Sequence, residues 1–177
     1  ATILYNLSAS DEIIGKAAYR RDLVRMQSGR GQCGYVYCDA GQGESSTDLV
    51  FAAHNIIAEN GSILAQSKRF ATGLTISEID VKRMDYERRR QNTFHTEDVF
   101  DYAEIPFDMQ LRETKLTRTI AQTPFVPSNK DDLAERCEEI LTLQATGLAT
   151  RVRHAHAKTA VVGLSGGLDS ALALVVT

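Results

Sequence analysis

A short polar turn near the C-terminal end of the chain carries residues that could hold phosphate. Residues 165–170 read Ser-Gly-Gly-Leu-Asp-Ser, between an apolar run at 159–164 and a second apolar run rich in Ala and Leu. This order predicts a buried strand, a glycine turn and the start of a helix. Glycines let the backbone approach an anion closely, and unpaired N–H groups of the first helical turn point toward it. The stretch therefore predicts a phosphate cradle.

Three kinds of phosphate-binding loop can be compared with this turn. A Walker P-loop requires a Lys before its Ser or Thr, and residues 165–170 contain no Lys. The dinucleotide fingerprint requires three glycines at fixed offsets, which Gly163, Gly166 and Gly167 do not have. The turn instead resembles the pyrophosphate loop of the ATP pyrophosphatases, Ser-Gly-Gly-x-Asp-Ser. The alternative is an ordinary glycine turn that joins a strand to a helix.

The resemblance to ATP pyrophosphatases implies a set of ATP-binding residues and a metal. The expected ATP-binding residues are Gly163, Leu164, Ser165, Gly166, Gly167, Leu168, Asp169 and Ser170. Backbone N–H groups and the two serine hydroxyls of the turn would hold the phosphates. Asp169 would act through bound Mg²⁺, because a carboxylate beside phosphates is otherwise repulsive.

The overall composition argues against several classes of function. Of the 177 residues, 43% are hydrophobic and 24% charged, as in ordinary globular proteins, and the net charge is −3. This charge gives no reason to expect nucleic-acid binding, and no apolar run of about 18 residues is present to cross a membrane. Cys33, Cys38 and Cys137 lack metal-site spacing and are expected to be reduced thiols of a cytoplasmic protein. Both ends look cut, so a fragment is expected.

The first hundred residues predict a mixed arrangement of strands and helices. A helix is expected over residues 13–28, with Ser10 or Asp11 as its N-cap. Asn60-Gly61 separates two β-like runs and predicts a hairpin, because both turn residues must accept positive φ. Strands are expected at residues 1–7, 33–39, 48–59, 62–67, 73–80 and 99–102, with a helix or loop at 81–90.

A connector and a second unit follow. Residues 106–128 have no periodic apolar face and are punctuated by prolines at positions 106, 124 and 127, which indicates a connector. A long helix with regular apolar spacing is expected after it, capped by Ser128, with two Asp residues in its first turn, and running to Val152. The strand at 159–164 would then lead into the glycine turn.

Several motifs along the chain together resemble one family. They are Asn-Leu-Ser-Ala-Ser at 6–10, Cys-Gly-Tyr-Val-Tyr at 33–37, Gly-Glu-Ser-Ser-Thr-Asp-Leu at 43–49, Ile-Ala-Glu-Asn-Gly at 57–61 and Pro-Phe-Val-Pro at 124–127. Together with the turn at 165–170, they are similar to the glutamine-dependent NAD⁺ synthetases. That family joins a nitrilase-like glutaminase domain to an ATP-pyrophosphatase synthetase domain.

The family resemblance implies the fold class α/β and two domains. Residues 1–105 would form the C-terminal part of a nitrilase-like α/β sandwich, which is the glutaminase domain. Residues 106–128 would be the interdomain connector. Residues 129–177 would begin a Rossmann-like α/β domain of the adenine nucleotide alpha hydrolase type, which is the synthetase domain.

The same resemblance implies a reaction. The carboxylate of nicotinic acid adenine dinucleotide (deamido-NAD) would attack the α-phosphate of ATP, and ammonia from glutamine would displace AMP to give NAD⁺. ATP and Mg²⁺ are thus the expected cofactors, beside the substrates deamido-NAD and glutamine. The full-length protein is expected to be a cytoplasmic homo-oligomer, without nucleic-acid or membrane partners.

Two residues match family positions that bind glutamine, namely Ser10 and Lys16. Chemistry alone would favour a helix N-cap for Ser10 and an exposed helix lysine for Lys16. The catalytic Glu, Lys and Cys of the family's glutaminase precede the segment that matches Ala1, so no catalytic residue is expected here and the segment alone is expected to be inactive. Cys33 and Cys38 are not expected to replace that nucleophile, because it precedes the 6–10 motif. Residues 30–32, Arg-Gly-Gln, depart from the family pattern.

Two other functional interpretations remain open at this point. One is a nitrilase-like hydrolase fused to a different ATP-pyrophosphatase ligase. The other is a non-catalytic, oligomer-forming domain that carries a vestigial loop. Adjoining sequence and an activity assay on the full-length protein would discriminate among the three.

Overall fold

The structure is a computed structural model that describes residues 1–44, 48–93, 101–127 and 129–177. The chain divides into two compact units, Ala1–Arg118 and Thr119–Thr177. This boundary lies inside the stretch 106–128 that the sequence marks as a connector. Among the described residues, no helix combines the length and apolar character needed to cross a membrane.

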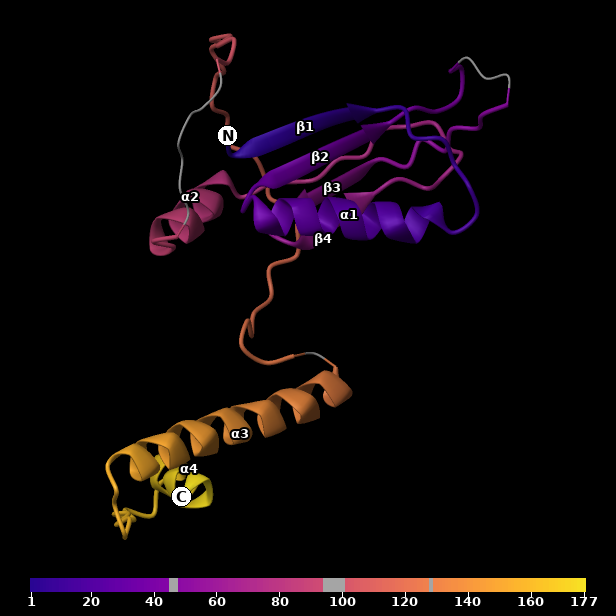
Figure 1. Ribbon diagram of the computed structural model, residues 1–177. Helices are drawn as coiled ribbons and strands as arrows, with labels where there is room; N and C mark the ends of the chain where they lie inside the picture. The colour runs from indigo at the N-terminus through magenta and orange to yellow at the C-terminus, as the bar shows by residue number, and fades with distance from the viewer. Residues whose placement is uncertain (45–47, 94–100, 128) are drawn as a thin grey trace. The chain divides into compact units, whose positions relative to one another are not determined.

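The first unit is built on a four-stranded sheet with the strand order β1-β2-β3-β4 (Figure 1). Strand β1 (Ile3–Ser8) pairs in parallel with β2 (Gly34–Asp39), and the helix α1 (Lys16–Arg30) makes the crossover that a parallel pair requires. Strand β2 pairs antiparallel with β3 (Ile56–Glu59), and β3 with β4 (Ser62–Gln66). A mixed α/β fold is therefore confirmed.

The core of this unit lies between α1 and the sheet. Val24 of α1 packs with Tyr37 of β2 and with Ile56 and Ala58 of β3, all of them buried. Burying apolar area of this kind is the main stabilising term of a small unit. Because α1 packs against β2, β3 and β4, the core holds the crossover helix against the sheet.

The hairpin predicted at Asn60-Gly61 is confirmed. Both turn residues have positive φ, 44° for Asn60 and 83° for Gly61. The turn also contacts α1, because the Gly61 N–H donates to the Ser28 hydroxyl at 2.9 Å. A Cβ added to Gly29 would lie 3.2 Å from the Gly61 Cα, so glycine at position 29 permits this close approach.

The N-cap predicted for α1 is wrong. The helix begins at Lys16, and its N-cap is Gly15 in the left-handed conformation, with no side-chain cap. The two residues expected to cap it make contacts with distant residues instead: the Ser10 N–H donates to Asp39 Oδ1 at 3.1 Å, and Asp11 forms an isolated β-bridge with Phe51. The segment 9–15 is thus an ordered loop rather than a first helical turn.

Three predicted strands are shorter than expected or missing. The run 48–59 forms a strand only at β3, because the residues before it lie in the loop that bridges to Asp11. Residues 73–80 form no strand; Ile79 instead lies against Gly34 of β2, where a Cβ would be only 2.9 Å from the Ile79 side chain. Of the predicted strand 99–102, residues 99 and 100 lie outside the described residues, and 101 and 102 are irregular.

Helix α2 (Val81–Arg90) completes the first unit. The Asp80 side chain caps it by accepting a hydrogen bond from the Arg83 N–H at 3.0 Å. Met84 is fully buried, which anchors the helix. The sequence left residues 81–90 as a helix or a loop, and the capping Asp together with the buried Met decides in favour of a helix.

The second unit contains helix α3 (Lys130–His154) and helix α4 (Leu168–Val176). The predicted long helix is confirmed, with Asn129 as its N-cap accepting from the Asp131 N–H at 3.1 Å. The predicted cap, Ser128, lies outside the described residues. Residues 159–164 form no strand, so that expectation is wrong. A strand needs a neighbour to satisfy its backbone, and the described part of this unit offers only helices and loops.

Candidate functional site

The glycine turn is formed by residues that lie at the start of α4. Gly166 has a φ of 84°, which favours glycine, and Gly167 is the N-cap in an extended conformation. The first backbone hydrogen bond of the helix runs from the Ala171 N–H to the Gly167 carbonyl at 3.1 Å. The N–H groups of the preceding helical residues therefore have no acceptor within the helix and are positioned to meet an anion.

The two serines of the turn hold it closed. Ser165 Oγ donates to Ser170 Oγ at 3.2 Å, and Ser170 Oγ donates to the Gly167 carbonyl at 2.9 Å. All the expected ATP-binding residues from Gly163 to Asp169 are exposed, and Ser170 is half-buried. The structure thus brings the predicted residues together in one accessible turn, with the strand before it absent.

Asp169 lies in the first turn of α4, where its negative charge suits the helix dipole. No cluster of three or more His, Cys, Asp or Glu side chains is available to hold a metal among the residues that the structure describes. One exposed carboxylate fits Mg²⁺ only as a ligand shared with phosphate oxygens and water, which is how this ion commonly binds beside nucleotides. Asp169 is consistent with that mode.

The predicted glutamine-binding residues, Ser10 and Lys16, lie in the first unit beside the turn that precedes α1. Lys16 Nζ donates to the Asp11 carbonyl at 2.6 Å and to its side-chain Oδ1 at 2.7 Å. An ammonium has three donors, so Lys16 keeps one for a ligand. Ser10 is held by Asp39, whose Oδ1 accepts from the Ser10 N–H at 3.1 Å.

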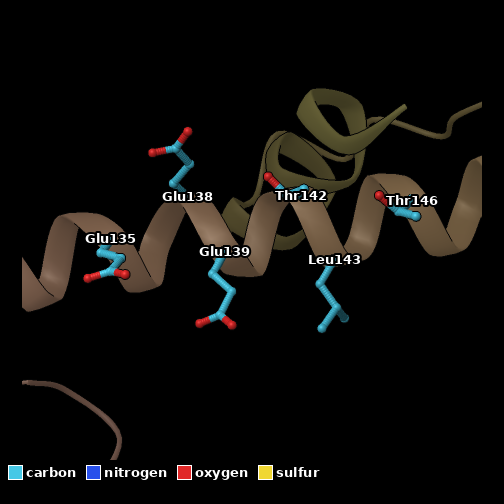
Figure 2. Close-up of a pocket in the computed structure, with 6 residues that line it drawn as sticks. All are labelled: Glu135, Glu138, Glu139, Thr142, Leu143 and Thr146. Atoms are coloured by element: carbon cyan, nitrogen blue, oxygen red, sulfur yellow. The ribbon is translucent and has the colours of Figure 1, made fainter.

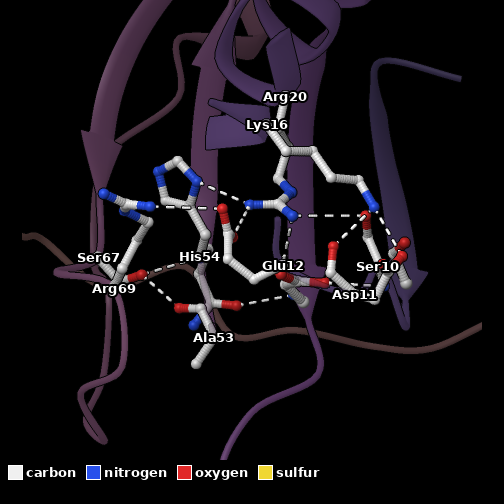
Figure 3. A network of polar contacts seen from close by, with 12 residues as sticks. Ser10, Asp11, Glu12, Lys16, Arg20, Ala53, His54, Ser67 and Arg69 are labelled. Carbon is white, nitrogen blue, oxygen red and sulfur yellow. Dashed lines mark hydrogen bonds and ion pairs between the residues drawn. The ribbon is translucent and has the colours of Figure 1, made fainter. Parts of the chain in front are cut away.

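The buried guanidinium of Arg20 lies next to Ser10 and Glu12 (Figure 3). Arg20 is 2% exposed, and its Nη1 donates to Glu12 Oε2 at 2.7 Å, while its Nη2 donates to Ser10 Oγ at 3.4 Å. Asp39 Oδ2 lies 3.8 Å from Nη2. Because Ser10 Oγ accepts from Arg20, its own hydrogen remains available as a donor toward an oxygen.

His54 closes the buried network. Its Nδ1 lies 3.2 Å from Arg20 Nη1, and because a guanidinium can only donate, Nδ1 must be the acceptor of a neutral ring. Burial lowers the pKa of His54, and the charge of Arg20 lowers it further. Burial alone would raise the pKa of Glu12, but the hydrogen bond and charge of Arg20 outweigh it and leave this pKa below its usual range. The network therefore holds Glu12 charged and His54 neutral.

The cysteines do not contribute to this site. Cys33 is 1% exposed, and burial raises the pKa of its thiol, which disfavours the nucleophilic thiolate. Cys38 is half-buried and Cys137 exposed, and all three thiols are free. The sequence-based rejection of Cys33 as a nucleophile fits this burial.

A shallow depression on α3 is an unsuitable phosphate site. It is lined by Glu135, Glu138, Glu139, Thr142, Leu143 and Thr146 (Figure 2). Three carboxylates on one stretch of helix would repel an anion at contact distance. Figure 2 also shows Glu138 pointing away from Glu135 and Glu139, so the three do not converge on a common point.

The network of Arg20, Glu12 and His54 was missed in the sequence, although His54 reads there as a packed or hairpin-face residue rather than a ligand. Arg20 reads as one of several polar residues on an amphipathic helix, and no local pattern separates it from its exposed neighbour Arg21. The one available signal was composition: an Asp-Glu pair directly after the serine-rich motif 6–10. A buried cation requires such partners.

Comparison with known proteins gives a consistent result. No protein-family model matches the chain. The glutamine-dependent NAD(+) synthetase of Mycobacterium tuberculosis (strain ATCC 25618 / H37Rv) is 39% identical over 186 residues, covering 99% of this chain and 27% of that protein. The enzyme of the same name from Mycobacterium leprae (strain TN) is also 39% identical, with the same coverage. The chain thus spans about a quarter of the curated relatives it matches.

A solved structure is also similar. The crystal structure of a glutamine-dependent NAD(+) synthetase from Cytophaga hutchinsonii is 32% identical over 43% of this chain and 13% of that one, with a TM-score of 0.39. The sequence relationship, which runs along almost the whole chain, is the stronger finding.

Proposed function

Because this chain is homologous over 99% of its length to a segment of the glutamine-dependent NAD(+) synthetases, we propose that the protein containing it amidates deamido-NAD to NAD⁺. Residues 1–105 are then the C-terminal part of a nitrilase-like glutaminase domain, and 106–128 the connector. Residues 129–177 begin the Rossmann-like ATP-pyrophosphatase domain.

One observation at the glycine turn supports ATP binding most directly. Gly167 has a φ of −86°, which any residue adopts. Among the described residues, a Cβ added there would meet only Ser165 Oγ at 3.7 Å, an ordinary contact. Neither the backbone nor the packing therefore requires glycine at position 167. A phosphate that approaches the N–H groups at the start of α4 gives a reason for it, since a side chain there would obstruct that approach.

The proposed chemistry begins with activation of the carboxylate. One oxygen of the deamido-NAD carboxylate bonds to the α-phosphorus of ATP, and the bond to the leaving pyrophosphate breaks. The N–H groups of the turn bind and orient the phosphates as negative charge develops on the leaving group. Asp169 is the residue that would hold Mg²⁺, and the ion would supply charge neutralisation for the phosphates. Ammonia then bonds to the acyl carbon, the bond between that carbon and the bridging oxygen breaks, AMP leaves with this oxygen, and the nitrogen releases one proton to solvent.

The proposed role of Ser10 and Lys16 is to bind the glutamine that supplies the ammonia. The remaining Lys16 donor suits the carboxylate of an amino acid, and the Ser10 hydroxyl can donate to a carbonyl or carboxylate oxygen. The buried Arg20 network fixes the Ser10 backbone and hydroxyl, so this site is positioned in advance of binding.

We also infer that the 177 residues alone are inactive, because they span only 27% of the relatives' length. Likewise, we propose that the full-length protein is a homo-oligomer, which light scattering of the purified protein would test. The deciding experiment for the function incubates the full-length protein with ATP, deamido-NAD and either glutamine or ammonium, and follows NAD⁺, AMP and pyrophosphate. Production of AMP and pyrophosphate only with a different carboxylate acceptor would favour another ATP-pyrophosphatase ligase.

A further inference from the structure

A buried carboxylate on the sheet holds the last residue of the first unit. Glu59, on β3, is 3% exposed. Arg118 Nη1 donates to Glu59 Oε2 at 3.0 Å, and its Nη2 donates to Oε1 at 3.1 Å. This two-point contact between a guanidinium and a carboxylate is the strongest pairing geometry available to these groups. It joins residues that are far apart in sequence.

A second carboxylate, that of Glu78, accepts hydrogen bonds from the backbone of Thr117 and Arg118. Glu78 Oε1 accepts from the Thr117 N–H at 2.7 Å and from the Thr117 hydroxyl at 2.9 Å. Glu78 Oε2 accepts from the Arg118 N–H at 2.7 Å, and the Glu78 carbonyl accepts from Arg118 Nη1 at 3.2 Å. Both oxygens of this carboxylate are thus used on residues 117 and 118.

The Glu59 carboxylate is also linked to the N-terminus of α2 through Asp80. The Asp80 N–H donates to Glu59 Oε2 at 2.7 Å, and Asp80 caps α2. The stretch before Thr117, residues 101–116, is exposed and irregular. Arg118 is moreover the last residue of the first unit. After this irregular stretch the chain is therefore bonded to the sheet unit at Thr117 and Arg118, immediately before the boundary between the two compact units.

We infer that Glu59 and Glu78 form a clamp that fixes Thr117 and Arg118 to the sheet unit, so that the movable part of the connector begins at Thr119. The clamp is a positioning device. It sets where the connector leaves the first unit, well after residue 106, at which the sequence pattern changes. Without Arg118, the buried Glu59 carboxylate would keep only the Asp80 N–H and the more distant Arg83, whose Nη1 lies 4.0 Å from Glu59 Oε1. Losing the two-point contact would therefore leave a buried charge less well compensated, which favours the closed clamp.

Amide hydrogen exchange on the full-length protein tests the clamp. In the wild type, the Thr117 and Arg118 amides should exchange slowly and the flanking residues 113–116 quickly. Glu78→Gln and Arg118→Gln should each accelerate exchange at 117 and 118 by about tenfold or more. The first leaves the two amides a neutral side chain with a single acceptor oxygen, and the second removes both bonds from the guanidinium to Glu59. Arg112→Gln, at an exposed position of the same connector, is the matched control and should change nothing.

Either of two results would overturn the clamp: fast exchange at 117 and 118 in the wild type, or rates unmoved by both substitutions. Glu78→Gln also guards against misfolding of the Arg118 variant, since Glu78 is only half-buried.

A second readout concerns catalysis and rests on the proposed function. If the clamp positions the connector between the two domains, Glu78→Gln should lower glutamine-driven NAD⁺ synthesis more than ammonium-driven synthesis. Equal loss with both nitrogen sources, or no loss, contradicts this catalytic consequence. Wild-type protein that makes no NAD⁺ from either source would refute the proposed function instead, while the exchange experiment would still decide the clamp.

Discussion

The hydroxyl group of Ser165 donates to that of Ser170 at 3.2 Å, across the turn that begins α4. This contact closes the turn at the end of α4 where the first N–H groups have no acceptor within the helix. In the full-length protein, Ser165→Ala removes this contact and also the hydroxyl proposed to donate to a phosphate. It should therefore weaken ATP binding about 10- to 100-fold, the usual cost of a lost hydrogen bond to a charged group. Isothermal titration with ATP and Mg²⁺ measures it. Thr150→Ala, which removes an exposed hydroxyl from α3, is the control and should bind ATP normally.

Substitution of Gly167 should change ATP affinity without changing the stability of the fold. Gly167→Ala should leave the unfolding transition close to that of the wild type, because φ is negative and the space is open. ATP affinity should nevertheless fall about tenfold or more, since the methyl group would stand where a phosphate approaches. Gly147→Ala, in the exposed middle of α3, is the matched control. Equal ATP affinity of both variants would refute the proposed cradle.

The Lys16 ammonium has one donor still available, so we predict that its loss impairs only NAD⁺ synthesis driven by glutamine. Lys16→Met in the full-length protein should raise KM for glutamine about 10- to 100-fold, because a charge-assisted hydrogen bond is lost. Ammonium-driven synthesis should be unchanged. Steady-state kinetics with both nitrogen sources tests this, with Lys82→Met on α2 as the control. A loss that is equal for glutamine and ammonium would show that Lys16 acts through the fold rather than through glutamine.

His54 predicts a dependence of stability on pH. Its pKa is lowered below the ordinary value of 6.5 in the folded chain, so the unfolded chain binds the proton first as the pH falls. The stability that depends on neutral His54 is therefore fully present above pH 6.5 and decreases as the pH falls toward the folded-state pKa. His54→Gln, which keeps an acceptor for Arg20, should unfold with less pH dependence in this range. Denaturant unfolding at several pH values measures it, and parallel curves for both proteins would contradict the neutral, buried His54.

The elements that the sequence predicted best are those specified by local chemistry. Asn60-Gly61 favours a tight hairpin wherever it lies, and α3 combines regular apolar spacing with acidic residues in its first turn and basic residues in its last. The glycine turn likewise precedes α4 as predicted. In each case neighbouring residues alone favour the observed conformation, so distant contacts did not need to be known.

The elements that the sequence missed depend on contacts between distant residues. Ser10 and Asp11 are good N-cap residues, yet the bridge from Asp11 to Phe51 holds them in a loop. The burial of Arg20 could not be predicted either, because its partner His54 is 34 residues away. Glu59 and Arg118 are 59 residues apart. The phosphate-binding character of the turn at 165–170 was therefore predictable from the sequence. The buried network around Arg20 and the clamp formed by Glu59 and Glu78 were not.

The central claim, that this turn serves ATP-dependent synthesis of NAD⁺, is tested most directly by one assay on the full-length protein. NAD⁺ formation from deamido-NAD, ATP and Mg²⁺ is measured with ammonium as the nitrogen source, for the wild type and for Asp169→Asn. We predict NAD⁺ and AMP in equal amounts from the wild type, and a rate reduced about 10- to 100-fold in the variant, whose fold is retained. No NAD⁺ from the wild type, or an unchanged rate in Asp169→Asn, would contradict it.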